Sequence, residues 1–272
     1  MGYVDFILNL AGLLLWLNWR TIRFDPLEKR TPATLMGTLR PAAPKKIRRW
    51  HLLAVIAGLL VLRAVVYRWI GPFWVAKLDL MTTTPQFRSD WFPGILLFSF
   101  LSFGLTLGIF FVGLILLSLL QGPEPVHRLV KIPLGRVDGW PVWVKILLPF
   151  IATTVLWWSL SWPLDWIQNL PVSLALRCEQ SLVIGLGSYL VWKFPAGVLL
   201  ALYLLNSYIY FGKHPFWKYA GVTAQKLLQP LKPIPLRLGK VDFAPVAGIA
   251  IVFFAAEGIG HGLVWLYTKL PL

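Results

Sequence analysis

Residues 92–120 read FPGILLFSFLSFGLTLGIFFVGLILLSLL, without one charged side chain. About 20 apolar residues in a helix, at 1.5 Å per residue, cross the roughly 30 Å hydrocarbon core of a bilayer, so this stretch is long enough to span it. The whole chain has the same character, because 57% of its 272 residues are hydrophobic and only 14% are charged. Soluble domains carry about 25% charged residues. We therefore expect an all-α membrane protein.

Five other stretches are also long and apolar enough to cross a bilayer. The first could be mistaken for a signal peptide, but it has Asp5 in place of a basic start and no A-x-A site, so we expect a retained helix. The fifth contains Lys193-Phe194-Pro195 and is expected either to kink there or to lie partly outside the membrane. The six expected spans, arranged as three helical hairpins, are 3–19, 51–70, 92–120, 141–162, 182–211 and 243–268.

The connections between these spans alternate in charge. Of the 26 Lys and Arg residues, 18 fall in segments 20–50, 121–140 and 212–242. Basic connections stay in the cytoplasm, so we expect a bacterial inner membrane protein with both termini on the non-cytoplasmic side. Few aromatic residues are interleaved with these charges, which favours anionic lipid over nucleic acid as the partner. The residues expected to contact anionic lipid or a protein partner are Arg48, Arg49, Arg128, Lys131, Lys226, Lys232, Arg237 and Lys240.

Two of the basic connections, which are amphipathic, resemble each other. Residues 127–142 read HRLVKIPLGRVDGWPV, and residues 229–246 read QPLKPIPLRLGKVDFAPV. Each ends in Asp-x-x-Pro before an apolar span, with Asp138 and Pro141 in the first copy and Asp242 and Pro245 in the second. Asp accepts hydrogen bonds from unpaired N–H groups at a helix start, and Pro suits the first turn. The motif predicts helix initiation; the alternative is that Asp orders a lipid-binding or partner-binding surface.

At these residues the chain resembles the YggT family of small bacterial and plastid membrane proteins. The hallmark of that family is a Pro-rich basic stretch running into Gly-(x)-Asp-x-Ser-Pro, and here Ala244 stands where the family usually has Ser. The resemblance divides the chain into an N-terminal hairpin, 1–91, with its basic loop 20–50, and two YggT-like repeats, 92–170 and 171–272. It implies a scaffold, assembly factor or accessory subunit, since plastid relatives are linked to cytochrome-complex assembly and bacterial ones to envelope and osmotic phenotypes.

Four ionisable residues lie deep within the expected spans: Arg63, Lys193, Glu257 and His261. Such residues are costly in a bilayer and are candidates for function. Arg63 and Glu257 lie at similar depths, so we expect a salt bridge between them, with Lys193 as the rival partner. His261 follows Glu257 by four residues and shares its helix face. This cluster is interpreted as an interhelical lock; the alternatives are a channel or transporter path lined by the four residues, and a haem-binding electron-transfer subunit with His261 as axial ligand.

The sequence also lacks the features of an enzyme. It has no Walker loop, no H-E-x-x-H and no G-x-S-x-G motif. The single cysteine, Cys178, rules out an intramolecular disulfide and a Cys-based metal cluster. We expect a non-enzymatic protein without a metal site, without a cofactor apart from the haem alternative, and with other membrane-complex subunits as partners.

Overall fold

The computed structural model describes residues 3–21, 49–70, 76–78, 80, 84–87, 91–124, 126–168, 173–209, 214–234, 236–238 and 241–269. Most of the predicted loop 20–50, with Arg48, and also Lys240, lie outside these residues. The described chain is almost entirely helical, as its composition predicts. Two antiparallel pairs of two-residue strands complete it: β1 (Ala76–Lys77) with β2 (Gln86–Phe87), and β3 (Arg237–Leu238) with β4 (Val241–Asp242).

Among the residues that the structure describes, five helices are long and apolar enough to cross a membrane, which indicates a multi-pass membrane protein. They are α2 (Arg49–Ile70), α3 (Phe92–Leu120), α5 (Val142–Gln168), the continuous run of α6 (Leu174–Gly187), η5 (Ser188–Trp192) and α7 (Lys193–Tyr208), and α9 (Ala244–Lys269). The first expected span forms a helix, α1 (Tyr3–Thr21), that is not among the five. Its nineteen residues include Asp5, Asn9, Asn18 and Arg20, which lower its mean hydropathy.

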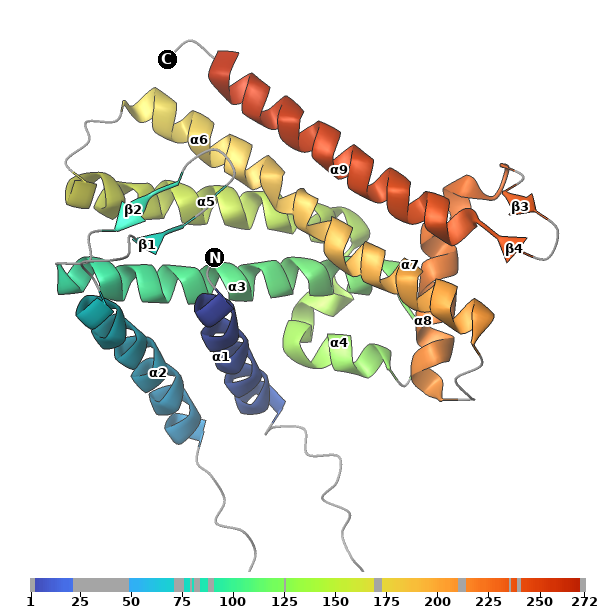
Figure 1. Cartoon of the computed structure of the whole chain (residues 1–272), viewed down its shortest axis with the longest axis horizontal. Helices are drawn as coiled ribbons and strands as arrows, with labels where there is room; N and C mark the ends of the chain where they lie inside the picture. Colours follow the sequence, from blue (N-terminus) through green and yellow to red (C-terminus); the bar gives the residue numbers. More distant parts are fainter. Residues whose placement is uncertain are drawn as a thin grey trace, which may run out of the picture. The chain divides into compact units, whose positions relative to one another are not determined.

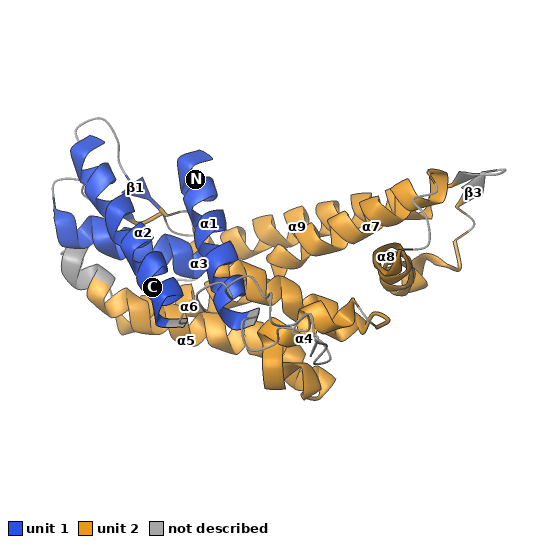
Figure 2. Cartoon of the chain, turned by 90° about the horizontal axis from the view of Figure 1, so that it is seen from below, with its two compact units in different colours: residues 1–77, 86–106 blue, residues 78–85, 107–272 orange. Residues whose placement is uncertain are grey.

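The chain separates into two compact units, residues 1–77 with 86–106 and residues 78–85 with 107–272 (Figure 2). The boundary falls inside α3, whereas the sequence places the start of the first repeat at residue 92. The first half of α3 joins the N-terminal hairpin because its side chains pack there. Phe103 forms a buried cluster with Ile56 and Leu60 of α2, and the Ser99 hydroxyl donates to the Leu60 carbonyl at 2.8 Å.

In unit 2, α5 packs against α6, and α7 packs against both α8 (Pro215–Leu227) and α9 (Figure 1). Gly185 permits the close approach of α6 to α5, since a Cβ there would lie 2.0 Å from Thr154 Oγ1. The interruption expected near Lys193-Phe194-Pro195 takes the form of the five-residue 3₁₀ segment η5. Pro195 lacks the N–H that would complete an α-helical bond in this turn, so a local tightening replaces a full kink.

The two similar connections both contain short helices. α4 (His127–Leu134) buries His127, Val130 and Leu134 on one face, a spacing that suits a helix lying on a surface. Gly135, with φ 59°, ends α4 and leads into the 3₁₀ turn η4 (Gly135–Gly139). In the second connection, α8 leads into the 3₁₀ turn η6 (Gln229–Leu231) and then into the β3–β4 pair.

The helix ends of unit 2 meet in two groups. At one end, the Lys226 ammonium of α8 donates to the carbonyls of Leu120 and Gln121, at 2.7 and 2.8 Å, and so caps the end of α3. At the other end, the Arg177 guanidinium of α6 lies 4.1 Å from the ring centroid of Trp162 in α5. Because Lys226 of the second connection contacts the end of α3, where the first connection begins, the two basic connections of unit 2 lie at the same end.

Candidate functional site

A buried polar cluster around Arg63 lies in unit 1. The Arg63 guanidinium forms an ion pair with Asp5 of α1 and donates to Asn9 Oδ1 at 2.8 Å and to Ser102 Oγ at 3.1 Å. The Tyr67 hydroxyl donates to the same Asp5 oxygen. The side chains of Arg63 and Asp5 are 0% and 3% exposed. This set, named the Arg63 cluster, holds α1, α2 and α3 together through charge-assisted hydrogen bonds.

The Arg63–Glu257 salt bridge expected from the sequence is wrong. Arg63 is enclosed by partners from unit 1, and Asp5 neutralises its charge. The sequence gives the depth of a residue along its own helix, but it does not reveal which helices are neighbours. The sequence does contain one indication of the true partner. Asp5 and Asn9 are two polar residues four apart in an apolar helix, so they share one helix face.

Glu257 and His261 lie on the surface of α9, at the middle of that helix. The His261 ring nitrogen Nδ1 lies 2.9 Å from the backbone oxygen of Glu257. A carbonyl oxygen only accepts, so Nδ1 is the donor in this contact. Within the described residues, no hydrogen bond or ion pair to the Glu257 carboxylate is found.

Lys193, the predicted rival partner of Glu257, is the first residue of α7. Its ammonium lies 5.3 Å from the ring centroid of Phe194, and it has no ion pair in the part of the chain that the structure describes. It lines a cavity of about 500 Å³ in unit 2. Among the described residues of unit 2, Lys193 therefore forms no ion pair with Glu257, while Glu257 and His261 are in contact through the α9 backbone.

Asp138 belongs to a second buried polar cluster, at the start of α5. Ser118 of α3 donates to Asp138 Oδ1, and the Lys145 ammonium of α5 donates to Ser118 Oγ at 2.9 Å. His127 Nε2 of α4 lies 3.6 Å from the same Asp138 oxygen, and Lys145 and His127 are both buried. Asp138 thus ties α3, α4 and α5 together, although sequence reasoning assigned it the capping of its own helix.

Asp242, the corresponding residue of the second copy, has the role that the motif predicts. Its Oδ1 accepts from the backbone N–H of Ala244 at 3.0 Å, at the start of α9. Pro245 follows in the first turn and is buried, while Pro141 directly precedes α5. Asp242 also lines a cavity of about 730 Å³ together with Lys232 and Tyr203.

Several of the predicted lipid-contacting residues have partners inside the chain. Glu124 accepts from Arg128 Nε at 2.9 Å and from Lys131 Nζ at 3.1 Å, and all three side chains are exposed. The hydrogen bond from Lys131 holds the pKa of the Glu124 carboxyl below its usual value, and the charges of Lys131 and Arg128 act in the same direction. Lys226 caps α3, as described above, and Lys232 is exposed. Arg49 and Arg237 belong to α2 and β3.

Tyr219 connects α8 to the Asp138 cluster electrostatically. Burial raises the pKa of the Tyr219 phenol above its usual value, and the charge of the Asp138 carboxylate acts in the same direction. Tyr219 also packs against Gly122, where a Cβ would lie 2.0 Å from its ring. The neutral phenol is therefore part of the packing between the two basic connections of unit 2.

Among the described residues, no group of three or more His, Cys, Asp or Glu side chains is arranged to hold a metal ion. No family model matches the sequence, and no curated protein or solved structure matches the chain. The described residues thus contain two closed polar clusters, around Arg63 and Asp138, and one open polar pair, Glu257 and His261.

Proposed function

We propose that this protein is a non-enzymatic accessory or scaffold subunit of a larger assembly in the bacterial inner membrane. The observation that carries this proposal is the position of Glu257, an ionisable residue at the middle of α9 whose side chain is exposed. Of the residues of α9, only Pro245, Gly248, Ala256 and Leu263 are buried inside the chain. A surface of this kind is typical of a helix that another membrane protein covers.

The free-energy cost of an acidic side chain in a bilayer favours a Glu257 that is covered by a partner protein. Insertion scales assign about 2.5–3.5 kcal/mol to an acidic residue at the centre of a membrane helix, and acidic residues inside a bilayer face a partner or water. In unit 1, Asp5 avoids this cost by pairing with Arg63. Glu257 has no such partner in the described chain. A basic or hydrogen-bonding side chain of another subunit would supply it.

The glycines beside Glu257 support helix docking. Gly258 and Gly262 are four residues apart, and a Cβ at either position would meet no atom within 4 Å. Small residues at this spacing let the backbones of two membrane helices approach closely. Gly185, in contrast, is already in contact within the chain, because Thr154 occupies the space in front of it. The open glycines remain available to a partner.

The proposed architecture has six spans, both termini on the non-cytoplasmic side, and two YggT-like repeats. Three features of unit 2 support the repeats: a short helix in each connection, a long helix that starts directly after or within each Asp-x-x-Pro motif, and the hydrogen bond from Lys226 of α8 to the end of α3. The proposed orientation rests on the excess of Lys and Arg in the connections, which keeps such segments in the cytoplasm.

The test is purification of the full chain from its native membrane in a mild detergent. We expect a companion protein to co-purify in stoichiometric amount and to be lost in Glu257→Leu and Gly258→Ile. The matched control is Gly58→Ile, because Gly58 of α2 also faces open space. Loss of the companion in Gly58→Ile as well, or co-purification that survives Glu257→Leu, contradicts the proposal.

The same preparations separate the alternatives. Ion or solute flux in reconstituted liposomes that Glu257→Gln abolishes, without a companion, would establish a channel or transporter in place of the scaffold. A Soret band that His261→Ala removes would establish a haem protein. We expect neither signal.

A further inference from the structure

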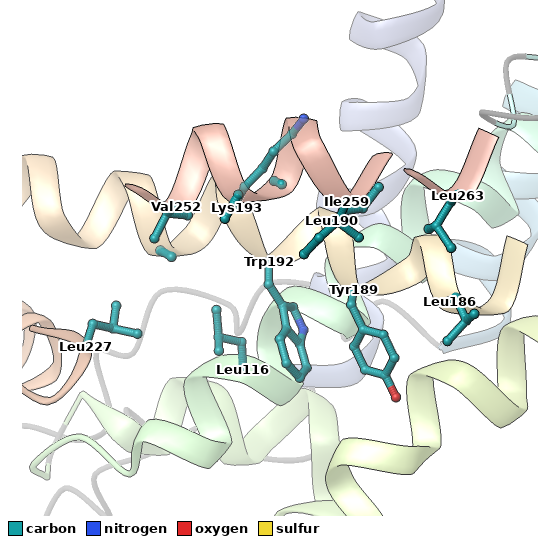
Figure 3. Close-up of a pocket in the computed structure, with 13 residues that line it drawn as sticks. Leu116, Leu186, Tyr189, Leu190, Trp192, Lys193, Leu227, Val252, Ile259 and Leu263 are labelled. Carbon is teal, nitrogen blue, oxygen red and sulfur yellow. The ribbon is translucent and has the colours of Figure 1, made fainter. Parts of the chain in front are cut away.

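Unit 2 contains an apolar cavity of about 500 Å³ between η5, α7 and α9 (Figure 3). We call it the Lys193 pocket, because Lys193 is the one charged residue among the described residues that line it. The Trp192 indole N–H donates to the Val112 carbonyl of α3 at 2.9 Å, and the Tyr189 hydroxyl donates to the Ile146 carbonyl of α5 at 2.6 Å. Since their polar atoms are engaged with α3 and α5, the two rings present apolar surface to the pocket.

The packing of α7 against α9 relates the depth of Lys193 to that of Glu257. The two helices run antiparallel (Figure 1). Gly197 of α7 lies against Phe253 of α9, since a Cβ at Gly197 would be 2.8 Å from the Phe253 ring. Lys193 precedes Gly197 by four residues and Glu257 follows Phe253 by four. Because the helices are antiparallel and rise equally per residue, Lys193 and Glu257 lie at about the same level.

This level is the middle of the bilayer. Glu257 lies at the middle of α9, and Lys193 is about 15 residues or more from either end of the run from Leu174 to Tyr208. At 1.5 Å per residue this is roughly 22 Å of helix, which is farther than a lysine side chain reaches. Lipid headgroups therefore cannot neutralise either charge.

Lys193 and Glu257 lie on opposite sides of α9 and do not pair within the chain. Ala255 and Ile259 of α9 line the pocket, whereas Glu257 does not. Glu257 is two positions from each of them, which is about 200° around the helix. Within the described residues, neither the Lys193 ammonium nor the Glu257 carboxylate has an ion pair. An unpaired acid therefore lies on one side of α9, and an unpaired base borders the pocket on the other side.

The side of α9 that carries Glu257 is exposed over about three helical turns. Residues three and four apart share one face of a helix. This face, which we call the Glu257 face, contains Phe254, Glu257, Gly258, His261 and Trp265. Phe254 is 78% exposed, and its ring suits an apolar pocket. A Cβ at Gly258 would meet no atom within 4 Å, so another helix backbone can approach closely here.

We propose that the Glu257 face of one copy of this chain docks on the Lys193 pocket of a second copy, where Glu257 forms an ion pair with the second copy's Lys193. The inference rests on the proposed function, in which another subunit covers Glu257, and it identifies that subunit as a second copy. Copies related by an axis perpendicular to the membrane keep every residue at its depth, so the two charges meet at one level. Because the contact uses opposite sides of α9, it is head-to-tail and continues around a closed ring.

The charges favour this occupant of the pocket over others. A lipid acyl chain would fill the apolar space, but it would leave Lys193 without a counter-charge at a depth where ionisable residues pair with one another. A helix of a different protein would need a carboxylate at the same depth. The chain itself supplies one, Glu257, on an exposed apolar helix.

The experiment uses two full-length copies with different tags, produced together and purified from the membrane in mild detergent through the first tag. We expect the second tag to be recovered with the wild-type chain. When both copies carry Lys193→Glu, or both carry Glu257→Lys, recovery should fall about tenfold, because like charges then face each other. The matched control is Lys218→Glu, at an exposed position of α8 outside the pocket. An equal loss in the control contradicts the inference.

A mixture of the two variants gives the decisive result. A copy with Lys193→Glu and a copy with Glu257→Lys should co-purify several-fold better than either variant with itself, because every contact between the two joins opposite charges. An ion pair within one chain could not be restored by mixing, and recovery also shows that both variants fold. A mixture that recovers no better than the single variants, or single variants that recover like the wild type, overturns the inference.

Cross-linking between copies tests the placement of the Glu257 face. The exposed Cys178 is first replaced by serine. Leu190→Cys in the pocket of one copy and Phe254→Cys in the other should then form a disulfide under mild oxidation. The control pairs Phe254→Cys with Val198→Cys, which is exposed on α7 outside the pocket. Equal cross-linking in the two pairs shows random collision and contradicts the inference.

The same purification separates a failure of this inference from a failure of the proposed function. If a different protein co-purifies, is lost in Glu257→Leu, and the second tag is absent, the proposed function holds and the second-copy inference is wrong. If neither a different protein nor the second tag co-purifies, both are wrong.

Discussion

Arg63 and Glu257 each interrupt an apolar helix, and the structure surrounds them in opposite ways. Arg63 is completely enclosed, with Asp5, Asn9 and Ser102 as partners. Glu257 is exposed and lacks a partner in the described chain. A satisfied buried charge locks neighbouring helices of one chain, whereas an unsatisfied one at the surface of a membrane helix points to something outside the chain.

The largest expected loss of stability comes from removing the counter-ion of the enclosed Arg63. Asp5→Leu leaves the buried Arg63 without its counter-ion and should lower the free energy of unfolding by about 3–5 kcal/mol. Thermal unfolding in detergent, followed by near-UV circular dichroism, measures the change. Glu257→Leu, on the open side, should leave this melting temperature unchanged or raise it.

The double variant Asp5→Leu with Arg63→Met serves as the control, because it removes both charges and should restore most of the lost stability. A melting temperature of Asp5→Leu equal to that of the wild type would show that the Arg63 cluster does not hold the three helices together.

The two Asp-x-x-Pro motifs offer a second comparison between closed and open settings. Asp138→Ala removes the acceptor of a buried network and should cost about 1.5–3 kcal/mol, as expected for hydrogen bonds to charged groups. Asp242→Ala removes a single cap bond and should cost about 1 kcal/mol. The same unfolding assay distinguishes the two; equal losses would mean that Ser118 and Lys145 do not depend on Asp138.

Two glycines, Gly185 and Gly258, allow the same comparison between a packed and an open position of a helix. Gly185→Ala places a methyl group against Thr154 and the Phe150 carbonyl, so it should destabilise the chain by about 1–3 kcal/mol through overpacking of α5 against α6. Gly258→Ala meets open space and should stabilise the isolated chain by up to about 1 kcal/mol, since alanine favours a helix. Melting temperatures that move in the same direction would contradict this assignment.

The smallest expected effect concerns the exposed charges beside α4. Because the pKa of Glu124 is lowered in the folded protein by Lys131, its ion pairs stabilise the fold above the ordinary carboxyl pKa of about 4.3 and are lost as the pH falls below it. Glu124→Gln should therefore match the wild-type melting temperature at pH 3 and fall slightly below it at pH 7. A difference that grows toward low pH would reverse the assigned sign.

The sequence predicted the helical membrane class because bilayer thickness sets a length and an apolar composition that can be read directly from residues 92–120. It also predicted where α5 and α9 begin, since Asp-x-x-Pro acts through local backbone geometry. The role of Asp138 could not be predicted in this way. Its partners Ser118, His127 and Lys145 come from three other parts of the chain, and the second copy contains no equivalent of His127 or Lys145.

The partner of Arg63 shows the same limit. Hydropathy and charge counting place a residue along the axis of its helix, so Arg63 and Glu257 looked equivalent. Which side chains meet depends on helix rotation and on which helices are neighbours, and packing of small and large side chains decides both. Tertiary structure therefore decided that Asp5 neutralises Arg63, that α9 presents Glu257 outward, and that Lys193 lines an apolar pocket. The sequence by itself determined that these residues lie in apolar helices, where each charge must find a partner.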